Sequence, residues 1–78
     1  MSLKKSFQKL FYQNPTEMSL DEIRSILEAF GYKLFNIRGS HFLFKKPNRK
    51  SIVFPVHHNK VTKFYLKTIR NTLKSQLK

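Results

Sequence analysis

Cysteine is absent from this chain of 78 residues, which excludes a disulfide framework, a thiolate metal site and a thiol nucleophile. Glycine is scarce, with only Gly31 and Gly39, so a glycine-rich loop that cradles nucleotide phosphates is also excluded. No apolar run approaches the roughly 18 residues that a membrane-spanning helix needs. Residues 1–10 lack the long apolar core of a signal peptide. We therefore expect a cytoplasmic protein without a membrane span.

Acidic side chains are few, and they are confined to one segment. Four acids stand against sixteen lysines and arginines, which gives a formal net charge of +12. The acids are Glu17, Asp21, Glu22 and Glu28. Residues 29–78 therefore carry twelve basic side chains and no acidic one, and they repel one another unless a polyanion or an acidic partner neutralises them. This charge leaves RNA, DNA, an acidic protein and an anionic membrane surface open as partners.

Two segments in the first third of the chain have apolar residues at helical spacing. The first covers residues 3–11 and ends at Asn14-Pro15, which predicts a short amphipathic helix whose apolar face is too small for a stable membrane anchor. In the second, Ser19 and Glu22 have the spacing of a capping box, and Gly31 fits the position just past a helix end. The apolar face of this second helix consists of Leu20, Ile23, Ile26, Leu27 and Phe30.

In the middle of the chain the spacing of apolar residues changes from helical to alternating, which predicts strands. Residues 32–37 and 40–46 are expected to form a hairpin joined at Arg38-Gly39. A turn over residues 47–50 then leads to a third strand over residues 51–56. Sequential strands with such short connections favour an antiparallel sheet.

A two-residue hairpin fixes which side chains share a face of this sheet. The residues expected to face the core are Phe35, Ile37, Phe42 and Phe44, followed in the third strand by Ile52, Phe54 and Val56. The residues expected on the opposite face are His41, Leu43 and Lys45, with Asn36 opposite His41. Pro55 lacks the N–H that a central strand needs, so the third strand is expected at a sheet edge.

After a loop over residues 57–60, helical spacing returns from about residue 61 to residue 77. The predicted buried side of this helix is Leu66, Ile69, Leu73 and Leu77. Lys63, Lys67, Arg70 and Lys74 form a basic stripe on the same helix, which is either a solvated face or a surface that meets phosphate.

The predicted fold class is α+β, with a three-stranded antiparallel sheet and helices on one of its faces. Residues 19–77 have the order α-β-β-β-α of small double-stranded-RNA-binding domains. An extra helical extension over residues 1–13 precedes this core. We expect one domain over residues 1–78.

The segment from Arg38 to Phe42 is the best candidate for catalytic chemistry. Gly39 permits a tight reversal because glycine tolerates positive φ, and His41 follows at the start of a strand. Histidine, with an unperturbed pKa of about 6.5, takes and gives protons near neutral pH. The three histidines are not spaced as metal ligands on a helix, and no nearby acid completes a set. We therefore expect no metal and no cofactor.

The chemistry that remains is cleavage of RNA through the substrate's own 2′-hydroxyl. General acid–base catalysis by His41 contributes typically about 10²- to 10⁴-fold to such a rate. Arg38 and Lys45 supply cations that stabilise the developing negative charge. His41 is equally compatible with an ordinary surface histidine on a strand. His57 and His58 are expected to satisfy backbone groups in their loop or to contact phosphate, and the alternative is a direct role in proton transfer.

Five short motifs follow one another along the chain. They are Asn14-Pro15, Met18-Ser19-Leu20-Asp21-Glu22, Phe30-Gly31-Tyr32, Gly39-Ser40-His41 and Pro55-Val56-His57-His58-Asn59. Together they resemble the HicA family of bacterial toxins, and the similarity covers about residues 14–74. The most specific element is Gly-Ser-His followed by alternating apolar residues, shortly after a helix that ends in an aromatic-Gly-aromatic step. Residues 1–13 precede the similar part.

The resemblance implies a double-stranded-RNA-binding-like fold, metal-independent cleavage of messenger RNA and a catalytic histidine, which maps onto His41. It also implies a protein partner, the HicB antitoxin, that covers the active site. We therefore expect an endoribonuclease toxin. Its expected RNA-binding residues are Arg38, Gly39, Ser40, Lys45, His57, Lys63, Lys67 and Arg70. The alternatives are a non-catalytic RNA-binding module of the same fold and a protein-interaction domain that docks an acidic partner.

Overall fold

The computed structural model describes residues 3–77; residues 1, 2 and 78, which belong to the predicted domain and its extension, lie outside this range. Its elements are α1 (Leu3–Tyr12), β1 (Glu17–Ser19), α2 (Leu20–Ala29), β2 (Lys33–Arg38), β3 (His41–Lys45), β4 (Ile52–Pro55), β5 (Lys60–Thr62) and α3 (Lys63–Lys74). Strands β2, β3 and β4 form a three-stranded antiparallel sheet in that order. The predicted α+β class is therefore confirmed, and so is the position of β4 at a sheet edge.

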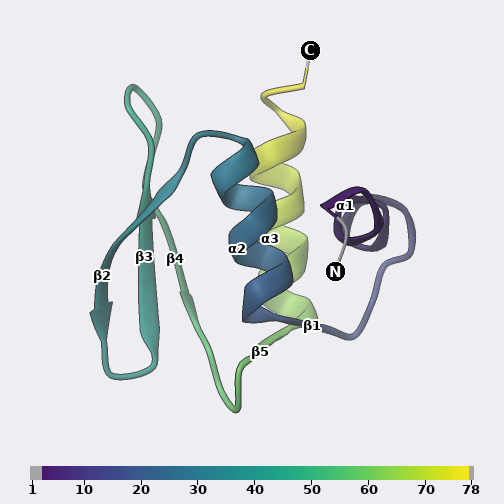
Figure 1. The fold of residues 1–78 in the computed structure, drawn as a ribbon, viewed down its shortest axis with the longest axis horizontal. Coiled ribbons are helices and arrows are strands. Elements are labelled where there is room, and N and C mark those ends of the chain that lie inside the picture. The colour runs from purple at the N-terminus through teal and green to yellow at the C-terminus, as the bar shows by residue number, and fades with distance from the viewer. Residues whose placement is uncertain (1–2, 78) are drawn as a thin grey trace.

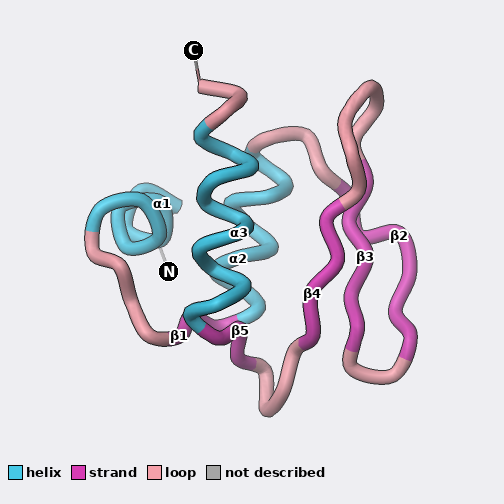
Figure 2. Tube along the Cα trace, turned by 180° about the vertical axis from the view of Figure 1, so that it is seen from behind, coloured by secondary structure: helices cyan, strands magenta, loops and turns pink. Residues whose placement is uncertain are grey.

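The elements are arranged in layers. Helices α2 and α3 run side by side and cover one face of the β2-β3-β4 sheet, and α1 lies on their far side, away from the sheet (Figure 1). Figure 2 shows the same order of layers from behind. Within residues 3–77, no helix has the length and hydropathy to cross a membrane.

Helix α2 begins and ends where the sequence predicts, because both of its ends are capped. At its start, the Ser19 hydroxyl accepts a hydrogen bond from the Glu22 N–H, and the Glu22 carboxylate accepts one from the Ser19 N–H, each at 3.2 Å. At its end, Gly31 has a φ of +94°, and the N–H of Tyr32 donates to the Leu27 carbonyl at 2.9 Å. This is the hydrogen bond of a Schellman motif, which satisfies a carbonyl left free by the helix end.

The core lies between the inner face of the sheet and the helix pair. Phe44 and Phe54 stack on neighbouring strands with ring centroids 5.6 Å apart, and both are buried. Ile52 and Phe54 of β4, and Val56 just after it, are buried as predicted. The buried apolar residues of the two covering helices are Ile23, Ile26, Leu27, Leu66, Ile69 and Leu73. A few bulky side chains thus form one cluster, as a chain of this size requires.

Helix α1 is built into this core rather than appended to it. Leu10 and Phe11 are buried, and the Phe11 ring stacks on Phe30 of the α2 end with centroids 6.4 Å apart. The Lys9 ammonium lies 3.5 Å from the carboxylate of Glu22, which is itself buried. The expected N-terminal helix is therefore confirmed, and its inner side contacts the α2 helix through both apolar and charged groups.

The start and end of the last helix differ from the prediction. Residues 60–62 form β5, which pairs with β1 in a small second sheet and buries Val61 opposite Met18. Alternation over three residues is too short to distinguish from the first turn of a helix, so this pairing was not predicted. Leu77, predicted as buried, is 53% exposed, because α3 ends at Lys74 and the chain leaves the core there.

The prediction that Phe35 faces the core is wrong. The pairing of β2 with β3 shifts register between Leu34 and Asn36, so Leu34 lies opposite Phe44 on the inner face. Phe35 is the extra residue of this β-bulge, and its side chain is 65% exposed. Ile37 shares a face with Phe42, as predicted, and lies opposite it, but it stays about half exposed because β2 is an edge strand.

The hairpin turn lies one residue later than predicted. Arg38 pairs with His41, so the turn consists of Gly39 and Ser40, and only Gly39 has a positive φ, of +57°. Glycine takes this first central position in type II′ turns, whose twist matches that of the strands. As a consequence Asn36 lies opposite Leu43, and the prediction that it opposes His41 is wrong.

Candidate active site

The outer face of the β2-β3-β4 sheet is open in the part of the chain that the structure describes, since α2 and α3 lie on the inner face (Figures 1 and 2). Phe42 and Phe44 of β3 pack toward the core, so the residues between and beside them point outward. These are His41, Leu43 and Lys45, as the alternation predicts. Their neighbour on β4 is the exposed Val53, which lies opposite Leu43.

A hollow of about 250 Å³ is centred on this face. It is lined by Asn36, Arg38, His41, Leu43 and Val53. Arg38 and His41 are direct cross-strand neighbours, so their side chains stand next to each other on one face of the sheet. The hollow is therefore lined by three polar groups, an imidazole, a guanidinium and an amide, and by the apolar side chains of Leu43 and Val53.

The turns at the end of the sheet bring further polar groups close to His41. The N–H of Val56 donates to the carbonyl of Ser40 at 2.7 Å, which attaches the end of β4 to the hairpin turn. His57 follows directly and exchanges two backbone hydrogen bonds with Lys60, at 2.9 and 3.1 Å. The His57 backbone thus closes the loop, and the His57 residue is exposed.

Lys45 shares the outer face with His41 but does not lie beside it. The two residues are four positions apart on β3, about 13 Å at the usual rise of a strand, and Leu43 stands between them. The Lys45 ammonium instead lies 4.1 Å from the centroid of the Phe35 ring. Lys45 therefore extends the basic surface along the sheet rather than completing the hollow.

The basic residues of α3 belong to another part of the molecule. Lys63, Lys67 and Arg70 lie on a helix that packs against the inner face of the sheet. The Arg70 guanidinium donates to the Asn14 side-chain oxygen at 3.5 Å, in the segment that follows α1. The structure thus brings together Arg38, Gly39, Ser40, His41 and His57, and leaves the α3 stripe apart from them.

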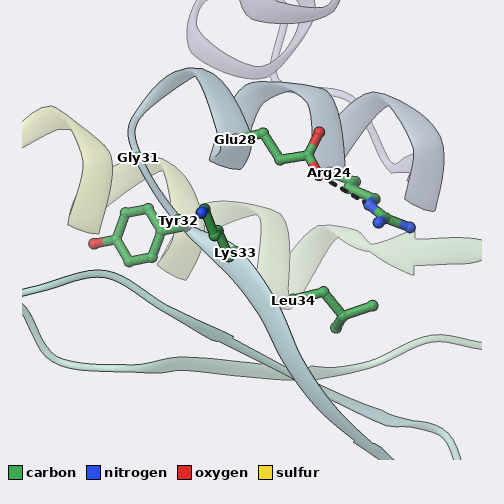
Figure 3. Close-up of a pocket in the computed structure, with 6 residues that line it drawn as sticks. All are labelled: Arg24, Glu28, Gly31, Tyr32, Lys33 and Leu34. Atoms are coloured by element: carbon green, nitrogen blue, oxygen red, sulfur yellow. Dashed lines mark hydrogen bonds and ion pairs between the residues drawn. The ribbon is translucent and has the colours of Figure 1, made fainter.

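A larger hollow, of about 400 Å³, lies between the end of α2 and β2. Figure 3 shows its lining residues, with the Arg24 and Glu28 side chains turned toward one another along α2. Their ion pair, at 3.1 Å, is of the helix-surface type with a spacing of four residues. The Tyr32 hydroxyl accepts a hydrogen bond from Gln76 at 2.7 Å. This hollow holds no histidine, and its one acid is already paired with a cation, so it offers less chemistry than the smaller one.

Two residues of the outer face were not among the predicted site residues. Phe35 lies beside Lys45 because of the bulge in β2, and Asn36, which was expected on this face but opposite His41, lines the hollow from its position opposite Leu43. A signal for the bulge was present: the adjacent apolar residues Leu34 and Phe35 interrupt an otherwise alternating pattern. Among residues 3–77, no group of three or more His, Cys, Asp or Glu side chains is placed to hold a metal ion.

Comparison with known protein families gives one finding that bears on this site. The family described as HicA toxin of bacterial toxin-antitoxin matches residues 20–77. This stretch begins at α2 and contains the whole β2-β3-β4 sheet together with α3. No curated protein and no solved structure matches the chain.

Proposed function

This chain belongs to the HicA toxin family of bacterial toxin-antitoxin systems, and from that premise we propose that it is an endoribonuclease that cleaves messenger RNA, with His41 as the catalytic residue. The observation that supports the proposal best is the pairing of Arg38 with His41 at an open hollow on the sheet. An exposed face suits a polymeric substrate, which cannot enter an enclosed cavity. The site of action would be the cytoplasm, where messenger RNA is translated.

The proposed reaction uses groups of the RNA itself. The neutral imidazole of His41 accepts the proton of a 2′-hydroxyl, and the 2′-oxygen then bonds to the adjacent phosphorus. The bond from phosphorus to the 5′-oxygen breaks, and that oxygen takes up a proton from water or from the imidazolium that His41 has become. The products are a 2′,3′-cyclic phosphate and a free 5′-hydroxyl. The guanidinium of Arg38, next to His41, stabilises the additional negative charge on the phosphoryl oxygens.

The remaining predicted contacts fall on two surfaces. On the sheet, Gly39, Ser40 and His57 would meet the backbone of the RNA near the cleaved bond, and Lys45 would meet a phosphate further along β3. On α3, Lys63, Lys67 and Arg70 would bind a more distant part of a long RNA. Because such contacts release counterions from the RNA, binding should weaken steeply with salt.

A toxin of such a system has an antitoxin partner. We propose a HicB-type protein that covers the outer face of the sheet and so keeps RNA from His41. The net charge of +12 favours an acidic surface on that partner.

The test is cleavage of RNA by the purified protein in the presence of a chelator. We expect His41→Ala to reduce the rate by about 10²- to 10⁴-fold. Thermal unfolding should not change, because the His41 side chain is exposed. His58→Asn is the matched control: it removes another exposed histidine, and asparagine tolerates the positive φ of +52° at that position.

Equal cleavage by His41→Ala and the unmodified protein would exclude His41 as the catalytic residue. Salt-dependent binding of RNA with no cleavage by either protein would favour the non-catalytic RNA-binding module.

A further inference from the structure

Phe35 is an aromatic residue on the outer face of the sheet. The bulge in β2 gives the inner position to Leu34 and turns Phe35 away from the core, leaving its side chain 65% exposed. A single exposed apolar residue is normal on a protein surface and needs no explanation by itself. Phe35 differs from such a residue because a cation lies over its ring.

The ring of Phe35 has a cation at one of its faces. The Lys45 ammonium lies 4.1 Å from the ring centroid, within the range of a cation–π interaction. Lys45 belongs to the same face of β3 as His41, and the ring is therefore held on the face that carries the hollow. Exposed aromatic rings next to cations are the features by which proteins bind single-stranded nucleic acid, through base stacking and phosphate contact.

We propose that Phe35 is a stacking platform for an unpaired RNA base and that Lys45 binds a phosphate next to that base. This inference rests on the proposed function, because it takes the outer face to be the RNA-binding face. A base within a duplex already stacks on its neighbours and exposes only its edges, so it cannot lie flat on the ring. The RNA that occupies this face is therefore single-stranded, even though the order of elements is that of double-stranded-RNA-binding domains.

The position of Phe35 separates its role from that of His41. Phe35 lies next to Lys45, about 13 Å from His41 along β3, so the stacked base is a few nucleotides away from the cleaved bond. Phe35 contributes to binding and to the choice of substrate, not to proton transfer. Its removal should raise KM for a single-stranded substrate and leave kcat nearly unchanged.

The experiment measures binding of a fluorescently labelled single-stranded RNA of mixed sequence in a His41→Ala background, which prevents cleavage from obscuring affinity. Adding Phe35→Ala should raise Kd by roughly 5- to 150-fold, the equivalent of one stacked base. The slope of log Kd against log salt should not change, because no charge is removed. Phe35→Tyr should restore binding and Phe35→Leu should not, since only tyrosine keeps an aromatic face.

Two controls separate stacking from other effects. Tyr12→Ala removes an aromatic residue that is 78% exposed on α1, beyond the helix pair from the sheet, and should leave Kd unchanged. A blunt duplex of the same sequence should bind with the same Kd to the His41→Ala protein with and without the Phe35→Ala substitution. If Phe35→Ala affects folding, the comparison of the tyrosine and leucine variants still decides the matter.

Unchanged Kd in Phe35→Ala, or equal Kd for the tyrosine and leucine variants, would overturn the proposal. A loss of antitoxin binding with unchanged RNA binding would do the same and would assign Phe35 to the protein interface. Each proposal can fail without the other. Normal RNA binding by the Phe35→Ala variant would contradict stacking on Phe35 but not catalysis by His41. Normal cleavage by the His41→Ala variant would contradict catalysis by His41 but not stacking on Phe35.

Discussion

Phe42 and Phe44 determine the direction in which His41 points. Phe44 is fully buried and Phe42 packs against the core, and alternation along β3 then turns His41 to the opposite face. Gly39 determines where β3 begins, because its positive φ places the turn between Arg38 and His41. The position of the imidazole therefore depends on residues with no chemical function of their own.

Gly39 allows a prediction that concerns the backbone alone. A Cβ added at this residue would meet no atom within 4 Å, so substitution causes no collision, yet the φ of +57° is strained for any residue with a side chain. We expect Gly39→Ala to lower the free energy of unfolding by about 1–3 kcal/mol, measured by urea denaturation. Ser40→Ala, at the other central position, should change it by much less. Equal effects of the two variants would show that the turn does not require glycine.

At the scale of elements, α1 lies outside the matched family region and nevertheless completes the core. Its outer side is different: Leu3, Phe7 and Tyr12 line an apolar surface hollow with Lys4 and Gln8. Leu3 is 46% exposed and Leu10 only 1% exposed, so Leu3 lies on the outer side of α1 and Leu10 on its buried side.

These leucines make a matched pair of substitutions. We expect Leu10→Ala to destabilise the protein by about 2–5 kcal/mol, because it leaves a cavity between α1 and the helix pair. Leu3→Ala should cost well under half of that, since almost half of the Leu3 surface stays exposed and truncation there leaves no enclosed cavity. Both are measured by thermal or urea unfolding. Similar small effects of both substitutions would mean that α1 is only loosely attached in solution.

The elements also show what the sequence predicts well. Helix α2 was predicted correctly because the Ser19-Glu22 box and Gly31 are local signals that the rest of the fold does not override. The inward direction of Phe54 followed from alternation over a buried strand. The pairing of Met18 with Val61 joins residues far apart in the chain, which local spacing does not reveal, whereas the bulge at Phe35 is signalled only by the adjacent apolar residues Leu34 and Phe35. The hollow was predicted only in part: Arg38 and His41 were expected there, whereas Asn36 was expected on this face opposite His41 and lies opposite Leu43, because the turn is one residue later than predicted.

For the whole molecule, the basic residues that are predicted to bind RNA lie on two surfaces rather than on one. Arg38 and Lys45 lie on the outer face of the sheet, and Lys67 and Arg70 lie on the helical side. The acids do not offset the sheet surface, because Glu22 is near Lys9 and Glu28 pairs with Arg24 on the helices. A short RNA that occupies the sheet face should therefore not reach the α3 stripe.

This separation predicts a dependence on the length of the RNA. For an oligonucleotide of about six nucleotides, near the lower end of the site sizes of small single-strand-binding domains, Arg38→Gln should reduce the salt slope of binding by about 0.7. Lys67→Gln should leave that slope unchanged, and it should reduce the slope only for a much longer RNA. Equal effects of both variants on the short RNA would show that one strand contacts both surfaces. The slopes come from binding titrations at several salt concentrations.

The irregularity in β2 also bears on self-association. Strand β2 pairs with another strand on one side only within residues 3–77, and the regular edge of a sheet is a template onto which the strand of another molecule can add. The extra residue at Phe35 interrupts this row of groups, and Lys33 and Arg38 place a positive charge at each end of it. Pairing between the β2 strands of two copies is therefore disfavoured, because the hydrogen-bonding pattern is interrupted and the charges repel one another. The bulge that turns Phe35 to the outer face therefore also makes β2 a poor template for pairing between copies of the protein.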